Sequence, residues 1–429
     1  MAKLSQQKTS GKNRSQPARR PQQKKRAVRK GASRSRNRMI LIGLVGIIVI
    51  GGAALIYTLV NNHIAAVNAA NAKAAAVAYA AGTAGGVMFG FNAQHTGLNP
   101  YERVLNTSDV AQLQQDWRVT TGGEITTAPV MLGGVVYIGS GDHKVYALDA
   151  ASGKIRWTAT LGNVISCAPA VANGIVYIGS YNDKFYALNA STGKTRWSVS
   201  IGGASSSSPT VVNGVVYVGS LGGSLYALDA SSGKTRWTFS TGAPINSSPA
   251  VANGTVYTGS NNGKVYAVDA STGKSLWTAT TGGPINSSPS VSNGKLYIGS
   301  GDHKVYALDT NTGDSLWIAT TGDAIESSPA VANGVVYIGS DDHKLYALDA
   351  STGGIRWTAS TGDKVQAPPV VANGVVYVGS DDDRLYALDA STGNMLWNTM
   401  LGNAATSSVA IANGVVYIGS DDGKLYAFH

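Results

Sequence analysis

Residues Ala332–Val371 read ANGVVYIGSDDHKLYALDASTGGIRWTASTGDKVQAPPVV, and this unit recurs through most of the chain. Its tryptophan returns every 40 residues, and these positions account for all the tryptophans in the protein: Trp117, Trp157, Trp197, Trp237, Trp277, Trp317, Trp357 and Trp397. No insertion interrupts the repeats between Trp117 and His429. A fixed period of this length is typical of a propeller or a solenoid.

Four short runs within the unit predict strands, at residues 335–338, 345–348, 355–358 and 369–371. They are rich in β-branched and aromatic residues, which favour pleated sheets. Asn333-Gly334 predicts a type I′ hairpin, because both central residues of that turn need positive φ. Four antiparallel strands in one unit match the size of a propeller blade.

The two ends of the repeat array predict how the ring closes. Trp117 arrives without a preceding turn motif, so the N-terminal end supplies a lone fourth strand. The last unit stops at Phe428-His429 and supplies three strands without a fourth. Together they complete one blade and leave no open edge between blades. The predicted fold is therefore all-β: an eight-bladed β-propeller of four-stranded antiparallel blades, closed by N- and C-terminal strands and preceded by one transmembrane helix.

The stretch from Ala347 to Trp357 reads A-x-D-x-x-T-G-x-x-x-W, and seven copies of this pattern stand in register. It resembles the tryptophan-docking motif of pyrroloquinoline-quinone-type (PQQ-type) propeller repeats, and the resemblance covers roughly Phe91 to His429. In that family the tryptophan is wedged between adjacent blades. The resemblance implies that all eight tryptophans have this docking role. Asn189 replaces the motif's Asp in one copy, and Asn can accept the same turn hydrogen bonds.

The N-terminal part of the chain divides into three segments before the propeller at 91–429. Residues 1–38 hold 14 Lys and Arg and no acid, which predicts a disordered cytoplasmic tail and leaves a charge of −4 for the remainder of the chain. Residues 39–60 are uncharged and apolar, long enough for a membrane-spanning helix. Residues 61–90 form an Ala-rich stalk. A cleaved signal peptide is the competing interpretation of residues 39–60, but this apolar run and the basic region before it are both too long for one.

This charge pattern predicts a single-pass protein of the cell membrane, with the N-terminus cytoplasmic and the propeller outside the cytoplasm. The basic tail suits an inside anchor that also touches anionic lipid, so no nucleic-acid partner is predicted. The membrane and another extracytoplasmic protein are the expected partners.

The inner strands predict what lines the central channel. The residues at the channel mouth are expected to be Thr126, Ser166, Ser206, Asn246, Asn286, Glu326, Gln366 and Thr406, and those at the next position Thr127, Cys167, Ser207, Ser247, Ser287, Ser327, Ala367 and Ser407. Small polar groups suit a narrow channel filled with water. A ligand or cation site is the alternative, with candidate residues Asn246, Asn286, Glu326, Gln366 and Lys364, because carboxylate and amide oxygens suit calcium.

The hairpin tips carry charged residues that predict solvated turns. His143, His303 and His343 each lie in Asp-His-Lys, and no metal site is expected from them. Carboxylates gather on three consecutive blades and their loops and form one acidic arc: Asp323, Asp341, Asp342, Asp363, Asp381, Asp382, Asp383, Asp421 and Asp422. The most direct expectation is a solvated surface, and the alternative is that a cationic partner docks on this arc.

The residues predict a binding scaffold rather than an enzyme, with no catalytic residue, no metal and no cofactor. The alternative is a PQQ-dependent dehydrogenase of alcohols or sugars, because the resemblance implies a quinone with calcium in the channel of active members. Short loops, a single cysteine and one carboxylate at the mouth, Glu326, argue against it. A polysaccharide binder would need exposed aromatic residues, of which Tyr181 is the obvious one.

Overall fold

The computed structural model describes residues 88–429 with the exception of 101 and 103. The predicted tail at 1–38, membrane helix at 39–60 and nearly all of the stalk at 61–90 lie outside the described residues. Within the described ones, no helix has both the length and the apolar character needed to cross a membrane.

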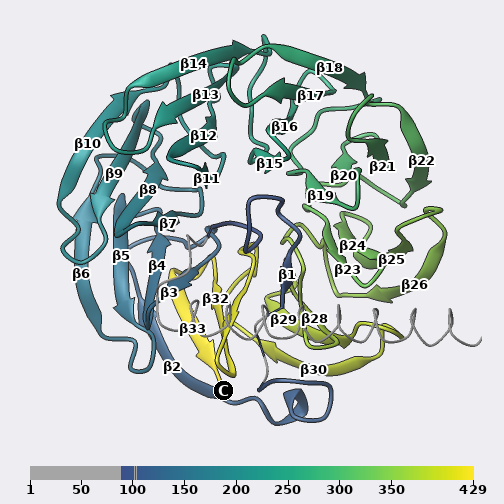
Figure 1. Ribbon diagram of the computed structural model, residues 1–429. Helices are drawn as coiled ribbons and strands as arrows, with labels where there is room; N and C mark the ends of the chain where they lie inside the picture. Colours follow the sequence, from purple (N-terminus) through teal and green to yellow (C-terminus); the bar gives the residue numbers. More distant parts are fainter. Residues whose placement is uncertain (1–87, 101, 103) are drawn as a thin grey trace, which may run out of the picture. The chain divides into compact units, whose positions relative to one another are not determined.

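Eight sheets follow one another around a ring, as predicted (Figure 1). Blades 1 to 4 are β3 (Val130–Leu132), β4 (Val135–Gly139), β5 (Lys144–Asp149), β6 (Ile155–Thr160); β7 (Ala170–Ala172), β8 (Ile175–Gly179), β9 (Lys184–Asn189), β10 (Thr195–Ser200); β11 (Thr210–Val212), β12 (Val215–Gly219), β13 (Ser224–Asp229), β14 (Thr235–Ser240); and β15 (Ala250–Ala252), β16 (Thr255–Ser260), β17 (Lys264–Asp269), β18 (Ser275–Thr280). Blades 5 to 7 are β19 (Ser290–Ser292), β20 (Lys295–Ser300), β21 (Lys304–Asp309), β22 (Ser315–Thr320); β23 (Ala330–Ala332), β24 (Val335–Ser340), β25 (Lys344–Asp349), β26 (Ile355–Ser360); and β27 (Val370–Ala372), β28 (Val375–Ser380), β29 (Arg384–Asp389), β30 (Met395–Met400).

Blade 8 is built from both ends of the described chain. Its strands are β31 (Ala410–Ala412), β32 (Val415–Gly419), β33 (Lys424–Phe428) and, from the N-terminal side, β2 (Gln115–Thr120). β2 runs antiparallel to β33, with Trp117 opposite Ala427. The closure predicted from the two ends of the repeat array is therefore present.

Each blade places its connections on two opposite faces. In each blade the first strand is the inner one and the fourth the outer one, and we call the turn between the third and fourth strands the docking turn, which is residues 350–354 in blade 6. On the docking-turn face this turn meets the hairpin between the first two strands, as where Ala350 N donates to Gly334 O. On the Asp-hairpin face, the loop between blades meets the middle hairpin, as where Asp341 N donates to Ala324 O. The two middle strands of each blade are buried because neighbouring blades cover both of their surfaces.

The tryptophans join the blades through the docking turns. Trp357 Nε1 and Tyr337 Oη both donate to Ala390 O, at 3.1 and 2.9 Å. Gly393 stands over the ring at φ +74°, where a Cβ would come within 2.6 Å of it. The same paired bonds reach the carbonyls of Ala150, Ala190, Ala230, Ala270, Thr310 and Ala350.

The lead-in segment, residues 88–114, crosses the centre of the ring before β2 begins (Figure 1). It contains the two-residue strand β1 (Leu98–Asn99), which pairs parallel with β27, and the 3-10 helix η1 (Val110–Gln112). Met88 packs into the cluster that holds Ala170 and Ala172 of blade 2. The packed part of the chain therefore begins no later than Met88, inside the segment that the sequence assigns to the stalk.

Candidate functional site: the central channel and its acidic rim

A polar cavity of about 170 Å³ lies at the centre of the ring. Seven of the eight predicted mouth residues line it: Thr126, Ser166, Ser206, Asn246, Glu326, Gln366 and Thr406. Asn286 is not among the lining residues. Its Oδ1 accepts from Asn246 Nδ2 at 2.8 Å, and Asn246 Oδ1 accepts from Ser206 Oγ at 2.6 Å. One hydroxyl and two amides from three successive blades are thus joined by hydrogen bonds to one another.

With the exception of Thr127, the residues of the second predicted ring do not line the cavity. Ser247 Oγ accepts from Gly259 N at 3.0 Å within its own blade, and Ser247 is fully buried. The next residue, Ser248, lines the cavity instead. Side chains alternate along a strand, so the first and third positions share the channel and the second does not. This alternation was the signal that the sequence prediction missed.

Five of the eight third positions carry serine hydroxyls along the channel: Ser208, Ser248, Ser288, Ser328 and Ser408. Ser208 N donates to Ser248 Oγ, Ser248 N to Ser288 Oγ and Ser288 N to Ser328 Oγ, at 2.8 to 2.9 Å. Ser408 Oγ donates to Pro368 O at 3.0 Å. These hydroxyls bind the backbones of neighbouring inner strands to one another, so they hold the ring together as well as lining the cavity.

The lead-in segment meets the inner strands at the end of the channel toward the docking-turn face. Its carbonyls at Ala93, Gln94, Thr96 and Gly97 accept from the N–H groups of four successive blades: Val251, Val291, Val331 and Val371. Phe89 lines the cavity and contacts the ring of His95 edge to face at 5.3 Å. The cavity is therefore floored by this segment, and its mouth lies on the Asp-hairpin face.

His95 anchors this floor. It is 2% exposed, and its Nε2 lies 2.9 Å from Thr210 Oγ1. Burial lowers the pKa of His95 to about 3, opposed by a hydrogen bond to the backbone of Pro289. The imidazole is therefore neutral in the folded protein at ordinary pH. Nothing in the repeat pattern marks this residue, because it lies outside the repeats.

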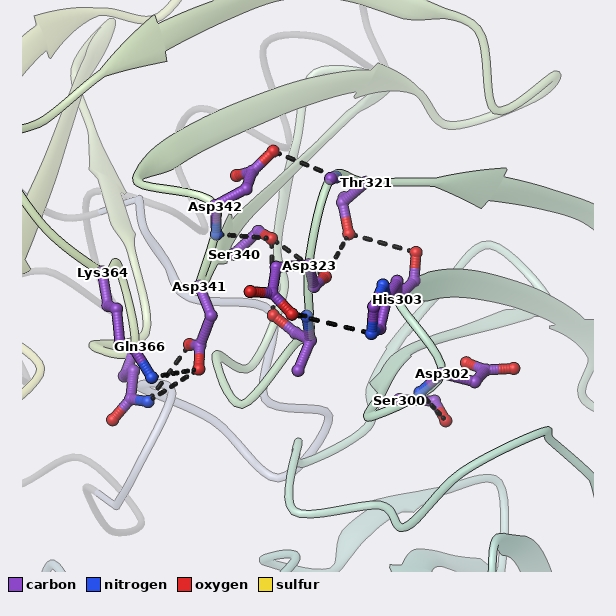
Figure 2. A network of polar contacts seen from close by, with 12 residues as sticks. Ser300, Asp302, His303, Thr321, Asp323, Ser340, Asp341, Asp342, Lys364 and Gln366 are labelled. Carbon is purple, nitrogen blue, oxygen red and sulfur yellow. Dashed lines mark hydrogen bonds and ion pairs between the residues drawn. The ribbon is translucent and has the colours of Figure 1, made fainter.

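Asp341 is the centre of a polar network at the channel mouth (Figure 2). Lys364 Nζ donates to its carboxylate at 2.9 Å and Gln366 Nε2 at 3.1 Å. The hydrogen bond to Asp341 raises the pKa of Lys364. Two of the five predicted ligand-binding residues, Lys364 and Gln366, are thus brought together, but they bind a carboxylate of the protein itself.

Asp381 occupies the equivalent position in the next blade and has a different environment. Gln366 turns to Asp341, while Thr406 Oγ1 donates to Asp421 at 2.8 Å. Those are the two mouth residues that the repeat offsets would give to Asp381. Its Oδ1 is buried without a hydrogen-bond partner. Burial, followed by the charges of Asp363, Asp341 and Asp421, raises the pKa of Asp381 to about 6.

Five of the other carboxylates of the predicted acidic arc fall into two groups. The second Asp of each hairpin has a structural role: Asp342 accepts from Tyr346 Oη and from Gly322 N of the preceding loop, and Asp382 and Asp422 accept from Tyr386 and Tyr426. The inter-blade carboxylates face histidines, with His303 Nε2 3.6 Å from Asp323 and His343 Nε2 3.5 Å from Asp363. These histidines are half exposed.

The donor set of the channel can be compared with what a quinone and its calcium ion require. Calcium takes six or more oxygen ligands, several of them carboxylates. Glu326 is the one carboxylate among the residues that line the cavity, and the charge of Asp341 is already matched by Lys364. Within the described residues, no three His, Cys, Asp or Glu side chains are grouped to hold a metal. The residues present therefore fit such a cofactor poorly.

Two family models match different parts of the chain. Residues 99–296 match the β-propeller of the beta-alanine-activating enzyme, and residues 303–429 match the outer membrane protein assembly factor BamB. No curated protein matches the sequence.

Solved structures with the same fold include BamB and several dehydrogenases. BamB from Moraxella catarrhalis is 22% identical with a TM-score of 0.65, over 74% of this chain and 99% of that one. The quinohemoprotein alcohol dehydrogenase from Comamonas testosteroni is 17% identical with a TM-score of 0.71, over 84% of each chain. A europium-containing methanol dehydrogenase is 18% identical with a TM-score of 0.70, over 80% of this chain and 97% of that one. At such identities the likeness shows the fold and leaves the function open.

Proposed function

We propose that this propeller of PQQ-like repeats serves as a binding scaffold rather than an enzyme. In this proposal the chain is held at the cell membrane and presents the Asp-hairpin face to a protein partner outside the cytoplasm. The likeness to BamB agrees with a scaffold, whereas the likeness to the dehydrogenases favours the alternative.

The observation that carries the proposal is the environment of Asp381. Its carboxylate is partly buried, lacks a partner at Oδ1 and stands among three other carboxylates. A partner that inserts a lysine or arginine beside it would relieve this repulsion and satisfy the free oxygen. We therefore expect the partner to present a basic surface or segment.

A photo-crosslinking amino acid tests this docking face in the full chain, in the membranes of the cells that make it. It is placed at Asp383 on the Asp-hairpin face and, as the matched control, at exposed Thr272 on the docking-turn face. We expect an adduct with one protein at position 383 and not at 272, and its loss in a double variant, Asp363→Asn with Asp381→Asn. Equal adducts at both positions, or an adduct that survives the double variant, would contradict the proposal.

The membrane topology rests on the sequence of the first 60 residues. The basic residues before Met39 favour an N-terminus inside and a propeller outside. Protease added to intact cells should then digest or release the propeller and spare the tail. A propeller that stays intact until the cells are lysed would refute this placement.

A PQQ-dependent dehydrogenase remains the second candidate, because Glu326, Gln366 and Asn246 line one cavity. Two of these residues are already bonded to other side chains, Gln366 to Asp341 and Asn246 to Asn286, so the cavity fits the quinone and its cation poorly. The assay mixes the purified protein with PQQ and calcium and follows reduction of an electron acceptor by alcohols and sugars. Turnover that disappears in Glu326→Ala would establish the dehydrogenase in place of the scaffold.

A further inference from the structure

Four lysines stand at the same repeat position on four consecutive blades. Lys154, Lys194, Lys234 and Lys274 each follow a docking turn, and all four side chains are exposed on the docking-turn face. The next three blades carry Asp314, Gly354 and Asn394 at this position. The lysines therefore form one continuous arc over blades 1 to 4, which we call the lysine arc.

Arginines two residues further along strengthen the arc. Arg156 and Arg236 are exposed and pair with the turn carboxylates of Asp149 and Asp229, each at 2.7 Å. Arg196 on the blade between them is exposed, and its turn carries Asn189 at the position of the Asp. Arg196 therefore lacks the turn carboxylate with which the other two arginines form an ion pair.

The balance of charge differs between the two parts of this face. Over blades 1 to 4 the four lysines of the arc and the three arginines beside it stand against the three turn carboxylates of Asp149, Asp229 and Asp269. Over blades 5 to 7 acidic side chains outnumber basic ones on this face, with Lys295 and Arg356 against Asp309, Asp314, Asp349 and Asp389. The net positive charge of this face therefore lies over blades 1 to 4, the sector where Met88 packs against blade 2.

We propose that the lysine arc binds the anionic phospholipid headgroups of a bilayer, so that the propeller stands with its docking-turn face toward the membrane. This inference rests on the proposed membrane attachment. It leaves the channel mouth and Asp381 on the opposite face, free for the protein partner. An arc of exposed lysines, one on each blade, matches a broad anionic surface better than a single small anion. Each lysine near such a surface contributes about 1 kcal/mol, and salt weakens the attraction.

Amine labelling of the full chain in nanodiscs tests the orientation. One set of nanodiscs contains phosphatidylcholine alone and the other a mixture with phosphatidylglycerol. We expect acetylation of Lys154, Lys194, Lys234 and Lys274 to slow in the anionic discs. Lys184 and Lys264, exposed on the Asp-hairpin face, should react equally in both and serve as internal controls. Equal labelling of the arc in both kinds of disc would overturn the inference.

Vesicle sedimentation separates this inference from the proposed attachment. If the chain fails to enter nanodiscs, the attachment fails, and the arc is then tested on sealed phosphatidylglycerol and phosphatidylcholine vesicles. Binding to the anionic vesicles should fall about fivefold for each Lys→Gln substitution in the arc, and not for Lys184→Gln. Binding that ignores these substitutions, or that prefers duplex DNA over vesicles, would refute the lipid surface.

Discussion

Each of the eight junctions between blades must hold a tryptophan. Seven junctions do so with a docking turn of the repeats, and the eighth does so with the lead-in segment, which has an unrelated sequence. In the repeats, a tryptophan and a tyrosine share one turn carbonyl, as Trp357 and Tyr337 share Ala390 O. At the eighth site the lead-in segment takes the place of a docking turn, and Trp397 Nε1 donates to Leu113 O at 3.1 Å. Tyr377 Oη is buried there without a partner. The comparison shows that the docking turn is replaceable, but at the cost of one hydrogen bond.

The lead-in segment compensates with contacts that the repeats do not have. The buried carboxylate of Glu102 accepts from the N–H groups of Val104 and Leu105, and from Gly414 N of blade 8. Phe428 packs edge to face on Trp397 at 5.4 Å. The junction of the two chain ends is therefore held by a few specific contacts, whereas the other junctions repeat one solution.

Deleting Asp422–His429 should have the largest effect on this comparison. It removes β33, and with it the pairing of Trp117 with Ala427 and the ring that covers Trp397. We expect the whole propeller to lose its cooperative thermal transition, because both the composite blade and the eighth docking site fail together. A truncated protein with unchanged melting would show that the ring does not depend on closure by its two ends.

The sequence predicts the repeated part of the molecule well and the unique part poorly. The 40-residue period, the Asn-Gly hairpins and the two incomplete end units were enough for the blades and for the pairing of β2 with β33. The path of the lead-in segment depends on backbone carbonyls, such as those of Ala93 and Gly97, that any residue provides. No residue pattern predicts such bonds. No repeat motif marks Leu113, whose carbonyl is the acceptor for Trp397 Nε1.

The repeats predicted which residues lie at the channel mouth, but not which hydrogen bonds those residues form. Repeat spacing brought Glu326, Gln366 and Asn246 to one mouth. It did not reveal that Asn286 satisfies Asn246, that Lys364 is paired with Asp341, or that Asp381 is left without a partner. These outcomes depend on which way each side chain turns between two neighbours. Because the repeats are nearly identical, the direction of each side chain depends on the few residues that differ between neighbouring blades.

Removing one tryptophan from each kind of docking site gives the next largest effect. Trp357→Ala should destabilise the protein by about 3–5 kcal/mol, because the indole is 9% exposed and leaves a cavity between blades. Trp397→Ala should cost less, since its ring is only partly buried and the turn glycine that covers Trp357 has no counterpart there. Chemical denaturation of both variants measures the difference. Equal losses would mean that the lead-in segment packs as well as a repeated turn.

The floor of the channel contributes a pH dependence of its own through His95. His95 has a folded pKa of about 3, against 6.5 for a free histidine. Because the neutral form is the one that folds, its contribution is complete above pH 6.5 and decreases below it. The loss should amount to about 1.4 kcal/mol for each pH unit between 6.5 and 3.

Denaturation between pH 7 and pH 4 tests this contribution. His95→Gln should flatten the slope, whereas His143→Gln, at an exposed hairpin tip of the repeats, should leave it unchanged. A slope that survives in His95→Gln would assign the acid sensitivity to other groups.

The smallest expected effect comes from making one repeat resemble its neighbours. Asn189 accepts from Ser191 N, Thr192 N and Thr192 Oγ1 at 3.0 Å, the bonds that Asp makes in other copies. Asn189→Asp should keep this turn and add an ion pair with Arg196, like that of Arg236 with Asp229. The gain in stability should be at most about 1 kcal/mol, because the pair is exposed to solvent. A thermal shift that vanishes in high salt would identify the new ion pair as its source. A clear loss of stability would mean that the turn distinguishes the amide from the carboxylate, and that the seven repeated sites are less alike than their sequences indicate.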